Sequence, residues 1–260
     1  MDLIHNKLLE LQMRKIISLI FLTLLPFYSF ATDHSSGGMA ALDFYSCSFN
    51  KGKNMADLRK LDAEYVEWAK ENYQPFMSYI LTPYVADSSD WDFDLLWLDI
   101  FKNHEGLGLS TQAWTENASE LEKKFNRVWN CDSRATATSI AFQPFEALGK
   151  EGFLTIHSCM LNNGRTYDDL MAANAAWVDH RKDVGIEDAM YLWSPDAGWA
   201  REDKTDFLTV YVAEDMAMRG RTMDKLWAGS GSVYNRIYDD VKSCDKSRVW
   251  LASPVGGHNY

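Results

Sequence analysis

The stretch CSFNKGKNMADL, residues 47–58, occurs a second time as CMLNNGRTYDDL, residues 159–170. The likeness extends to both sides when the sequence is shifted by 112 residues, with slips of one or two residues further along the chain. The matched pairs include Cys47 with Cys159, Tyr79 with Tyr191, Pro83 with Pro195, and Cys131 with Cys244. Self-similarity at a fixed spacing indicates a chain built from repeated units. We therefore expect a tandem duplication, with units at residues 41–143 and 153–255.

Residues 1–31 have the pattern of an export signal. Arg14 and Lys15 precede an apolar run at 16–30, which ends in small residues around Ala31 that a signal peptidase could read. The run is shorter than the ~20 apolar residues that a membrane-spanning helix needs. We expect the signal to be cleaved, which would leave a periplasmic or secreted protein with no membrane segment.

The chain is acidic: it has 37 Asp and Glu against 26 Lys and Arg, which gives a net charge of −11. Binding to duplex nucleic acid needs a basic surface that displaces counterions, so we expect no nucleic-acid partner. The 10 Trp, 12 Tyr and 13 Phe could serve either a core or a ligand pocket. The sequence gives no indication of an oligomeric state.

Four cysteines fall two to a repeat and allow three disulfide connectivities. Since each duplicated unit should have kept its own bridge, the repeat favours Cys47 with Cys131 and Cys159 with Cys244. An exported protein reaches an oxidising compartment where such bridges persist. A CxxC redox or metal motif is absent from the sequence.

The first unit has the pattern strand, helix, strand, strand, helix, strand. Its strands are expected at 42–49, 76–82, 93–101 and 134–142, with helices starting at Asn54 and lying around 121–128. The second unit repeats this order with strands at 189–194, 207–212 and 247–252, and with helices starting at Thr166 and lying around 234–241. Glycines Gly52 and Gly164 fit the turn after the first strand, where a positive φ suits glycine. This order predicts an α+β fold of two ferredoxin-like (βαββαβ) units.

Two such units in one chain resemble the dimeric α+β barrel superfamily, in which the sheets of two ferredoxin-like units face each other. The resemblance implies a pseudo-dimeric α+β barrel, with the first and last strands of each unit side by side, as the favoured cysteine pairs require. Families on this plan include cofactor-independent monooxygenases, haem enzymes such as chlorite dismutases, and small binding proteins. The fold does not choose among them. Since the sequence shows no metal-ligand cluster or phosphate-binding loop, we expect no cofactor.

Strand alternation assigns the residues of the third strand to two faces. Leu96, Leu98 and Ile100 form an aliphatic face that we expect to pack against helices, so Trp97 and Asp99 would point between the units. In the copy, Tyr211 occupies the position of Trp97.

These residues define a candidate site in an aromatic cleft between the repeats. Its predicted ligand-binding residues are Tyr79, Trp97, Tyr191 and Tyr211, and its predicted catalytic residues are His157 and Asp99. His157 could act as a general base because its pKa is ordinarily near neutrality. Burial would raise the pKa of Asp99 and suit it to the same task. A half-buried histidine that bonds a neighbour, and an aspartate at a strand end that reaches water, are the simpler interpretations.

Two functions of different classes follow. The first is an exported protein that binds a small aromatic molecule, or a cofactor-independent enzyme of the monooxygenase-like kind, with its site in the cleft. The alternative is a noncatalytic structural or interaction protein whose aromatic residues pack the two repeats together. An open space of several hundred Å³ between the sheets would favour the ligand, and a filled interface would favour the structural role.

Overall fold

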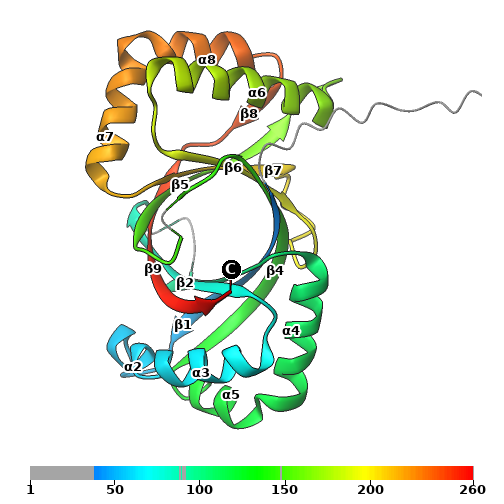
Figure 1. Ribbon diagram of the computed structural model, residues 1–260, viewed down its shortest axis with the longest axis vertical. Helices are drawn as coiled ribbons and strands as arrows, with labels where there is room; N and C mark the ends of the chain where they lie inside the picture. The colour runs from blue at the N-terminus through cyan, green and yellow to red at the C-terminus, as the bar shows by residue number, and fades with distance from the viewer. Residues whose placement is uncertain (1–37, 88, 90–91, 147, 260) are drawn as a thin grey trace, which may run out of the picture. The chain divides into compact units, whose positions relative to one another are not determined.

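A computed structural model describes residues 38–87, 89, 92–146 and 148–259 (Figure 1). The expected signal at 1–31 lies outside the described residues. The first half contains β1 (Met39–Phe49), α2 (Met55–Arg59), α3 (Asp62–Asn72), β2 (Phe76–Val85), β3 (Leu95–Phe101), α4 (His104–Asn117), α5 (Ser119–Phe125) and β4 (Trp129–Gln143). The second half contains β5 (Gly152–Leu161), α6 (Tyr167–Val184), β6 (Ala189–Pro195), β7 (Phe207–Ala213), α7 (Met216–Lys225), η2 (Leu226–Ser230), α8 (Gly231–Tyr238), β8 (Lys242–Cys244) and β9 (Arg248–His258).

Eight of the strands close into one antiparallel barrel. The strand order is β4-β1-β3-β2 in the first half and β9-β5-β7-β6 in the second. The halves join where β2 pairs with β9 and where β4 pairs with β6 (Figure 1). The short strand β8 extends the pairing along β5. The resemblance implied two sheets that face each other. In the structure, the edge strands of the two sheets are also hydrogen-bonded to each other, because an unpaired edge would leave backbone N–H and C=O groups without partners.

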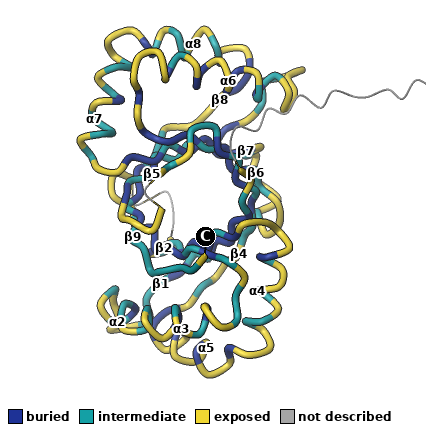
Figure 2. The backbone as a smooth tube through the Cα atoms, viewed as in Figure 1, coloured by how far each residue is buried: buried dark blue, intermediate teal, exposed yellow. Residues whose placement is uncertain are grey.

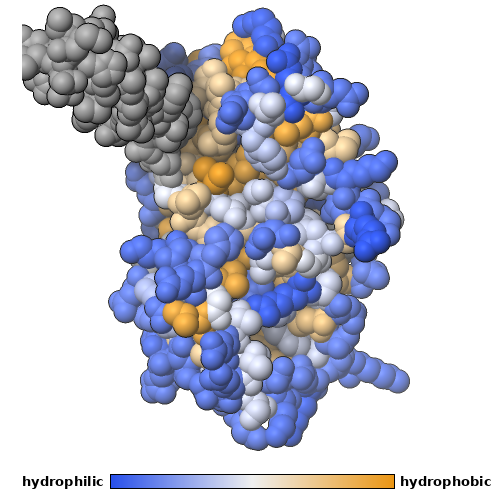
Figure 3. All heavy atoms as spheres, turned by 90° about the vertical axis from the view of Figure 1, so that its right-hand side faces the viewer, coloured by the Kyte–Doolittle hydropathy of each residue, from blue (hydrophilic) through white to orange (hydrophobic). Residues whose placement is uncertain are grey.

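The helices cover the outside of the barrel, with α2 to α5 on one side and α6 to α8 on the other (Figure 1). Apolar side chains gather in three clusters: one inside the barrel, and one between the strands and the helices of each half. Burial follows the strands and the inner sides of the helices (Figure 2). On the face shown in Figure 3, hydrophilic residues dominate and the apolar patches are separate. None of the described helices is long and apolar enough to cross a membrane.

The repeated stretch forms the same turn and helix start in both halves. Gly52 and Gly164 have φ values of 80° and 79°, the left-handed conformation that glycine adopts without strain. The side chain of Asn54 then caps α2 by accepting from the N–H of Ala56 at 2.9 Å. At the start of α6, the Thr166 side chain caps the helix, and the carboxylate of Asp169 accepts a hydrogen bond from the N–H of Thr166 at 2.9 Å. These helix starts agree with the sequence pattern.

The helices before the last strands differ between the halves. In the second half, Gly229 has a φ of 133° and interrupts the helix, which continues as α8 (Gly231–Tyr238). The sequence places a helix breaker at this point, since glycine lowers helix propensity. In the first half, α4 starts at His104 and takes in a stretch before residue 121 that the sequence pattern did not assign to a helix.

Both predicted disulfides are present in the structure. Cys47 pairs with Cys131 and Cys159 with Cys244, with sequence separations of 84 and 85 residues. Each bridge joins neighbouring strands in register, β1 to β4 and β5 to β8. The first strand of each half also pairs with its last strand, as the resemblance implied.

Candidate functional site

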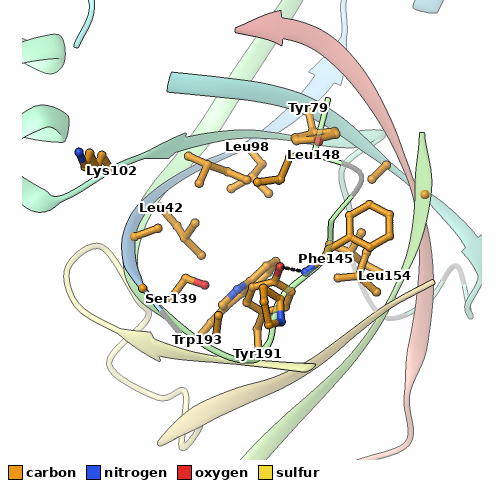
Figure 4. Close-up of a pocket in the computed structure, with 18 of the residues that line it drawn as sticks. Leu42, Tyr79, Leu98, Lys102, Ser139, Phe145, Leu148, Leu154, Tyr191 and Trp193 are labelled. Atoms are coloured by element: carbon orange, nitrogen blue, oxygen red, sulfur yellow. Dashed lines mark hydrogen bonds between the residues drawn. The ribbon is translucent and has the colours of Figure 1, made fainter. Parts of the chain in front are cut away.

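The barrel encloses a cavity of about 480 Å³ (Figure 4). We call this space the barrel cavity. Its wall is mostly aliphatic and aromatic, and side chains from strands of both halves contribute to it. The main contributors are Leu42, Tyr79, Leu81, Leu98, Ile100, Ser139, Leu154, Tyr191, Trp193 and Val212, together with Phe145 and Leu148 from the segment that links the halves.

The predicted orientation of β3 is wrong. Leu98 and Ile100 line the barrel cavity, whereas Trp97 and Asp99 point outward to the helices of the first half. In β7, Val212 likewise faces the cavity, and Tyr211 packs with the outer cluster of the second half. The aliphatic face lines the barrel because rings from the helices surround Trp97 on the outside, where Tyr65 and Phe125 contact it at centroid distances of 5.0 and 5.8 Å.

Tyr79 and Tyr191 both line the barrel cavity, on opposite halves (Figure 4). The hydroxyl of Tyr79 accepts a hydrogen bond from the N–H of Gly149 at 2.7 Å. The hydroxyl of Tyr191 accepts from the N–H of Phe145, also at 2.7 Å. Burial raises the pKa of both tyrosines, so they are neutral near pH 7. The repeated tyrosines therefore hold the linking segment against the cavity.

Trp97 and Asp99 belong to a second space of about 420 Å³ between the strands and the helices of the first half. We call this space the outer pocket. One oxygen of Asp99, Oδ1, accepts from Trp97 Nε1 at 2.9 Å and from the Tyr65 hydroxyl at 3.1 Å, and the Ser78 hydroxyl donates to it as well. Burial raises the pKa of Asp99 to about 7, although these hydrogen bonds oppose the shift.

His157 and Tyr211 lie on the outer face of the second half. The Nδ1 atom of His157 is 3.3 Å from the carbonyl oxygen of Asp245, and its ring meets that of Tyr211 edge-on at 6.2 Å. Burial lowers the pKa of His157, which favours the neutral imidazole. The guanidinium of Arg181 lies 5.3 Å from the centre of the Tyr211 ring, and burial raises the pKa of this tyrosine to about 12.

The six predicted site residues therefore occupy three places. Only Tyr79 and Tyr191 lie in the barrel cavity; Trp97 and Asp99 lie in the outer pocket, and His157 and Tyr211 lie in the second half. A single site made of all six does not form, because the faces of β3, β5 and β7 were assigned in reverse, whereas those of β2 and β6 were assigned correctly.

Solved structures share this fold. A proposed monooxygenase from Lactobacillus acidophilus aligns over 84% of this chain and 98% of its own, with a TM-score of 0.53 and 9% identity. A mutant chlorite dismutase from Candidatus Nitrospira defluvii covers 83% of this chain and 92% of its own, with a TM-score of 0.51 and 8% identity. A dye-decolorizing peroxidase from Bacteroides thetaiotaomicron covers 85% and 94%, with a TM-score of 0.50 and 8% identity.

This chain shares its closed antiparallel barrel fold with these solved structures. At identities of 8 to 9% the likeness concerns the fold alone. No protein-family model matches the sequence, and no curated protein sequence matches it. Within the part of the chain that the structure describes, no group of three or more His, Cys, Asp and Glu side chains could hold a metal ion.

Several residues of the barrel cavity were not among the predicted site residues. Trp193 shares a face of β6 with Tyr191, and the alternation of that strand places it at the same cleft. Phe145 and Leu148 come from the linking segment, and no sequence pattern assigns them to the wall. Lys102 and Lys150 also border the cavity and are exposed.

A buried lysine lies outside both spaces. Lys242 is 6% exposed, donates to the Thr209 hydroxyl at 3.0 Å and lies 4.0 Å from the centre of the Tyr238 ring. Burial lowers the pKa of Lys242 to about 7. The sequence around Lys242 resembles that around a surface lysine, so its burial results from tertiary packing.

Proposed function

We propose that this protein binds a mainly apolar small molecule in the barrel cavity. The observation that carries the proposal is a space of about 480 Å³ inside the barrel that the side chains of the described residues leave unfilled. Protein interiors pack like organic crystals, with few voids larger than a water molecule. The volume lies within the range of about 300 to 1,000 Å³ that is typical of small-molecule pockets. The structural role, in which aromatic residues only fill the interface, does not need such a space.

The wall of the cavity indicates the chemistry of the ligand. Leucine, isoleucine and valine side chains from both halves, with Trp193 and Phe145, favour an aliphatic or aromatic body. The hydroxyls of Tyr79 and Tyr191 already accept backbone hydrogen bonds from the linking segment. The exposed lysines Lys102 and Lys150 border the cavity and would suit a polar end of the ligand.

Binding is a better proposal than catalysis for this cavity. The two residues predicted as an acid and a base, Asp99 and His157, lie on the outer side of the barrel. A cofactor-independent monooxygenase-like reaction in the barrel cavity would therefore proceed without them. The solved structures with this fold support the architecture and leave the reaction open.

We also propose that residues 1–31 direct export and that residues 41–143 and 153–255 arose by duplication. The disulfides and the absence of a membrane-spanning helix among the described residues fit an exported protein. The corresponding strand orders of the two halves support the duplication. Sequencing the amino terminus of the exported protein tests the first point, and we expect it to begin at Thr32.

Filling the cavity tests the binding proposal. Ala141 and Ala252 are buried and line the cavity, so Ala141→Leu and Ala252→Leu place new methyl groups in the empty space. We expect the neutral fluorescent probe N-phenyl-1-naphthylamine to bind the wild type. The double variant should bind the probe with an affinity lower by a factor of about ten or more. Ala63→Leu on the exposed side of α3 is the matched control and should bind as the wild type does.

Two outcomes would count against the proposal. Equal binding by the wild type and the double variant would place the probe elsewhere. If the wild type binds neither this probe nor fatty acids and polycyclic aromatics, and filling the cavity raises the midpoint of thermal unfolding, the noncatalytic structural role is the better description.

A further inference from the structure

The outer pocket combines aromatic walls with one buried carboxylate. Its volume is about 420 Å³, and rings from strands and helices line it, among them Tyr45, Trp97, Trp114, Phe125 and Trp129. Asp99 lies among these rings and is 4% exposed. Since the barrel cavity lies on the other face of β3, the outer pocket is a separate site.

The two oxygens of Asp99 have different surroundings. Oδ1 receives the donors from Tyr65, Ser78 and Trp97. No described residue donates to Oδ2. This oxygen is also not one of the polar atoms that are sealed from solvent without a partner. Oδ2 is therefore the carboxylate oxygen that remains available to a donor entering the pocket.

The neighbouring charges leave the pocket acidic. The Nε and Nη2 atoms of Arg134 donate to the two oxygens of Asp43 at 2.8 and 2.6 Å, so its charge is already balanced by that carboxylate. The side chains of Glu122 and Asp132 add negative charge to the lining, and both residues are exposed. The guanidinium of Arg134 also lies 5.2 Å from the centre of the Tyr45 ring, which shows that an aromatic face here accepts a cation.

We infer that the outer pocket binds a protonated organic amine carried on an apolar or aromatic body. The ammonium group would donate to Oδ2 of Asp99, and the surrounding rings would contact both the cation and the body. A carboxylate ligand would meet Asp99 and the acidic lining, and a neutral ligand would leave the charge of Asp99 without a counter-ion. The chemistry of the pocket thus selects for positive charge.

The titration of Asp99 supplies an independent signature of this binding. Its pKa is about 7, and a cation binds the ionised form better, whereas a primary alkylamine stays protonated up to about pH 10. Affinity should therefore rise about tenfold between pH 6 and pH 8. The other titratable or charged groups that face Asp99 or line the pocket are Asp43, Tyr45, Tyr65, Tyr73, Glu122, Asp132 and Arg134.

Three phenyl compounds of similar size test the inference by calorimetry and tryptophan fluorescence. We expect phenethylamine to bind at least about tenfold more tightly than 2-phenylethanol or 3-phenylpropionate at pH 8. Asp99→Asn keeps the shape of the side chain and should lower the affinity for phenethylamine about tenfold or more, and remove its pH dependence. Asp224→Asn removes the same charge from an exposed position on α7 and should bind like the wild type.

The wild-type comparison holds even if Asp99→Asn fails to fold. Equal binding of the three compounds would show an apolar pocket without selection for charge, and would overturn the inference. Preferential binding of 3-phenylpropionate would instead identify Arg134 as the recognising group. Failure of all three to bind would also refute the inference, as would unchanged phenethylamine binding by a folded Asp99→Asn variant. Each of these results leaves the proposed binding in the barrel cavity untouched.

Discussion

Replacing Tyr79 or Tyr191 by phenylalanine removes one hydrogen bond from the segment that links the two halves. Each hydroxyl accepts a backbone N–H at 2.7 Å, from Gly149 and Phe145 respectively. Both hydrogen bonds are only partly buried, and such a bond contributes about 0.5 to 1.5 kcal/mol to stability. We expect each substitution to lower the free energy of unfolding by that amount. Since both bonds hold one segment, the double variant should lose less than the sum of the two.

Urea denaturation and amide hydrogen exchange measure the effect. If the segment opens locally, the exchange of the Gly149 and Phe145 amides should accelerate about tenfold for each 1.4 kcal/mol lost. Tyr84→Phe is the matched control, because Tyr84 is 53% exposed and the substitution should change stability by less than about 0.5 kcal/mol. Unchanged unfolding free energies together with unchanged exchange at both amides would refute the idea that the tyrosines hold the segment.

Two further predictions concern the disulfides and the buried lysine. Removing either bridge by paired Cys→Ala substitutions should lower the free energy of unfolding by roughly 4 to 5 kcal/mol, and by similar amounts for both, because the closed loops span 84 and 85 residues. Urea denaturation measures this loss. A Cys47 to Cys159 link in unreduced peptide maps would contradict the pairing. Because burial lowers the pKa of Lys242 to about 7, between pH 7 and pH 10 the unfolded chain holds a proton that the native chain has released, so native stability gains from rising pH. Relative to Lys242→Met, the wild type should therefore become more stable by up to about 1.4 kcal/mol per pH unit over this range, and a difference that does not vary with pH would disprove the argument.

The sequence identified features that depend on local pattern or on the repeat. The disulfide pairs follow from matched cysteines, and the helix starts at Asn54 and Thr166 follow from short-range capping. The faces of β3 could not be assigned in this way. Alternation separates Leu98 from Asp99, but both sides of a barrel strand under helices are buried, so polarity does not say which side is inside.

The candidate site depended on contacts between distant residues. A carboxylate such as Asp99 is tolerated in the outer core because Tyr65 and Ser78, which are 34 and 21 residues away, donate to it. The partners of the Tyr79 and Tyr191 hydroxyls are backbone groups of the linking segment, which carry no signal in the sequence. The repeated tyrosines lie at the barrel cavity, whereas the positions of the other four residues depended on the fold.

The two antiparallel seams of the barrel also determine what the peptide linkage between the halves contributes. One seam pairs β2 with β9 from Phe76 and His258 to Val85 and Val249, and the other pairs β4 with β6 from Ala137 and Pro195 to Gln143 and Met190. Each disulfide stays within its own half, so no covalent bond other than the main chain crosses the seams. A protease cut between the halves would thus leave a two-chain complex held by backbone hydrogen bonds. The two fragments, produced separately, should therefore reassemble by complementation.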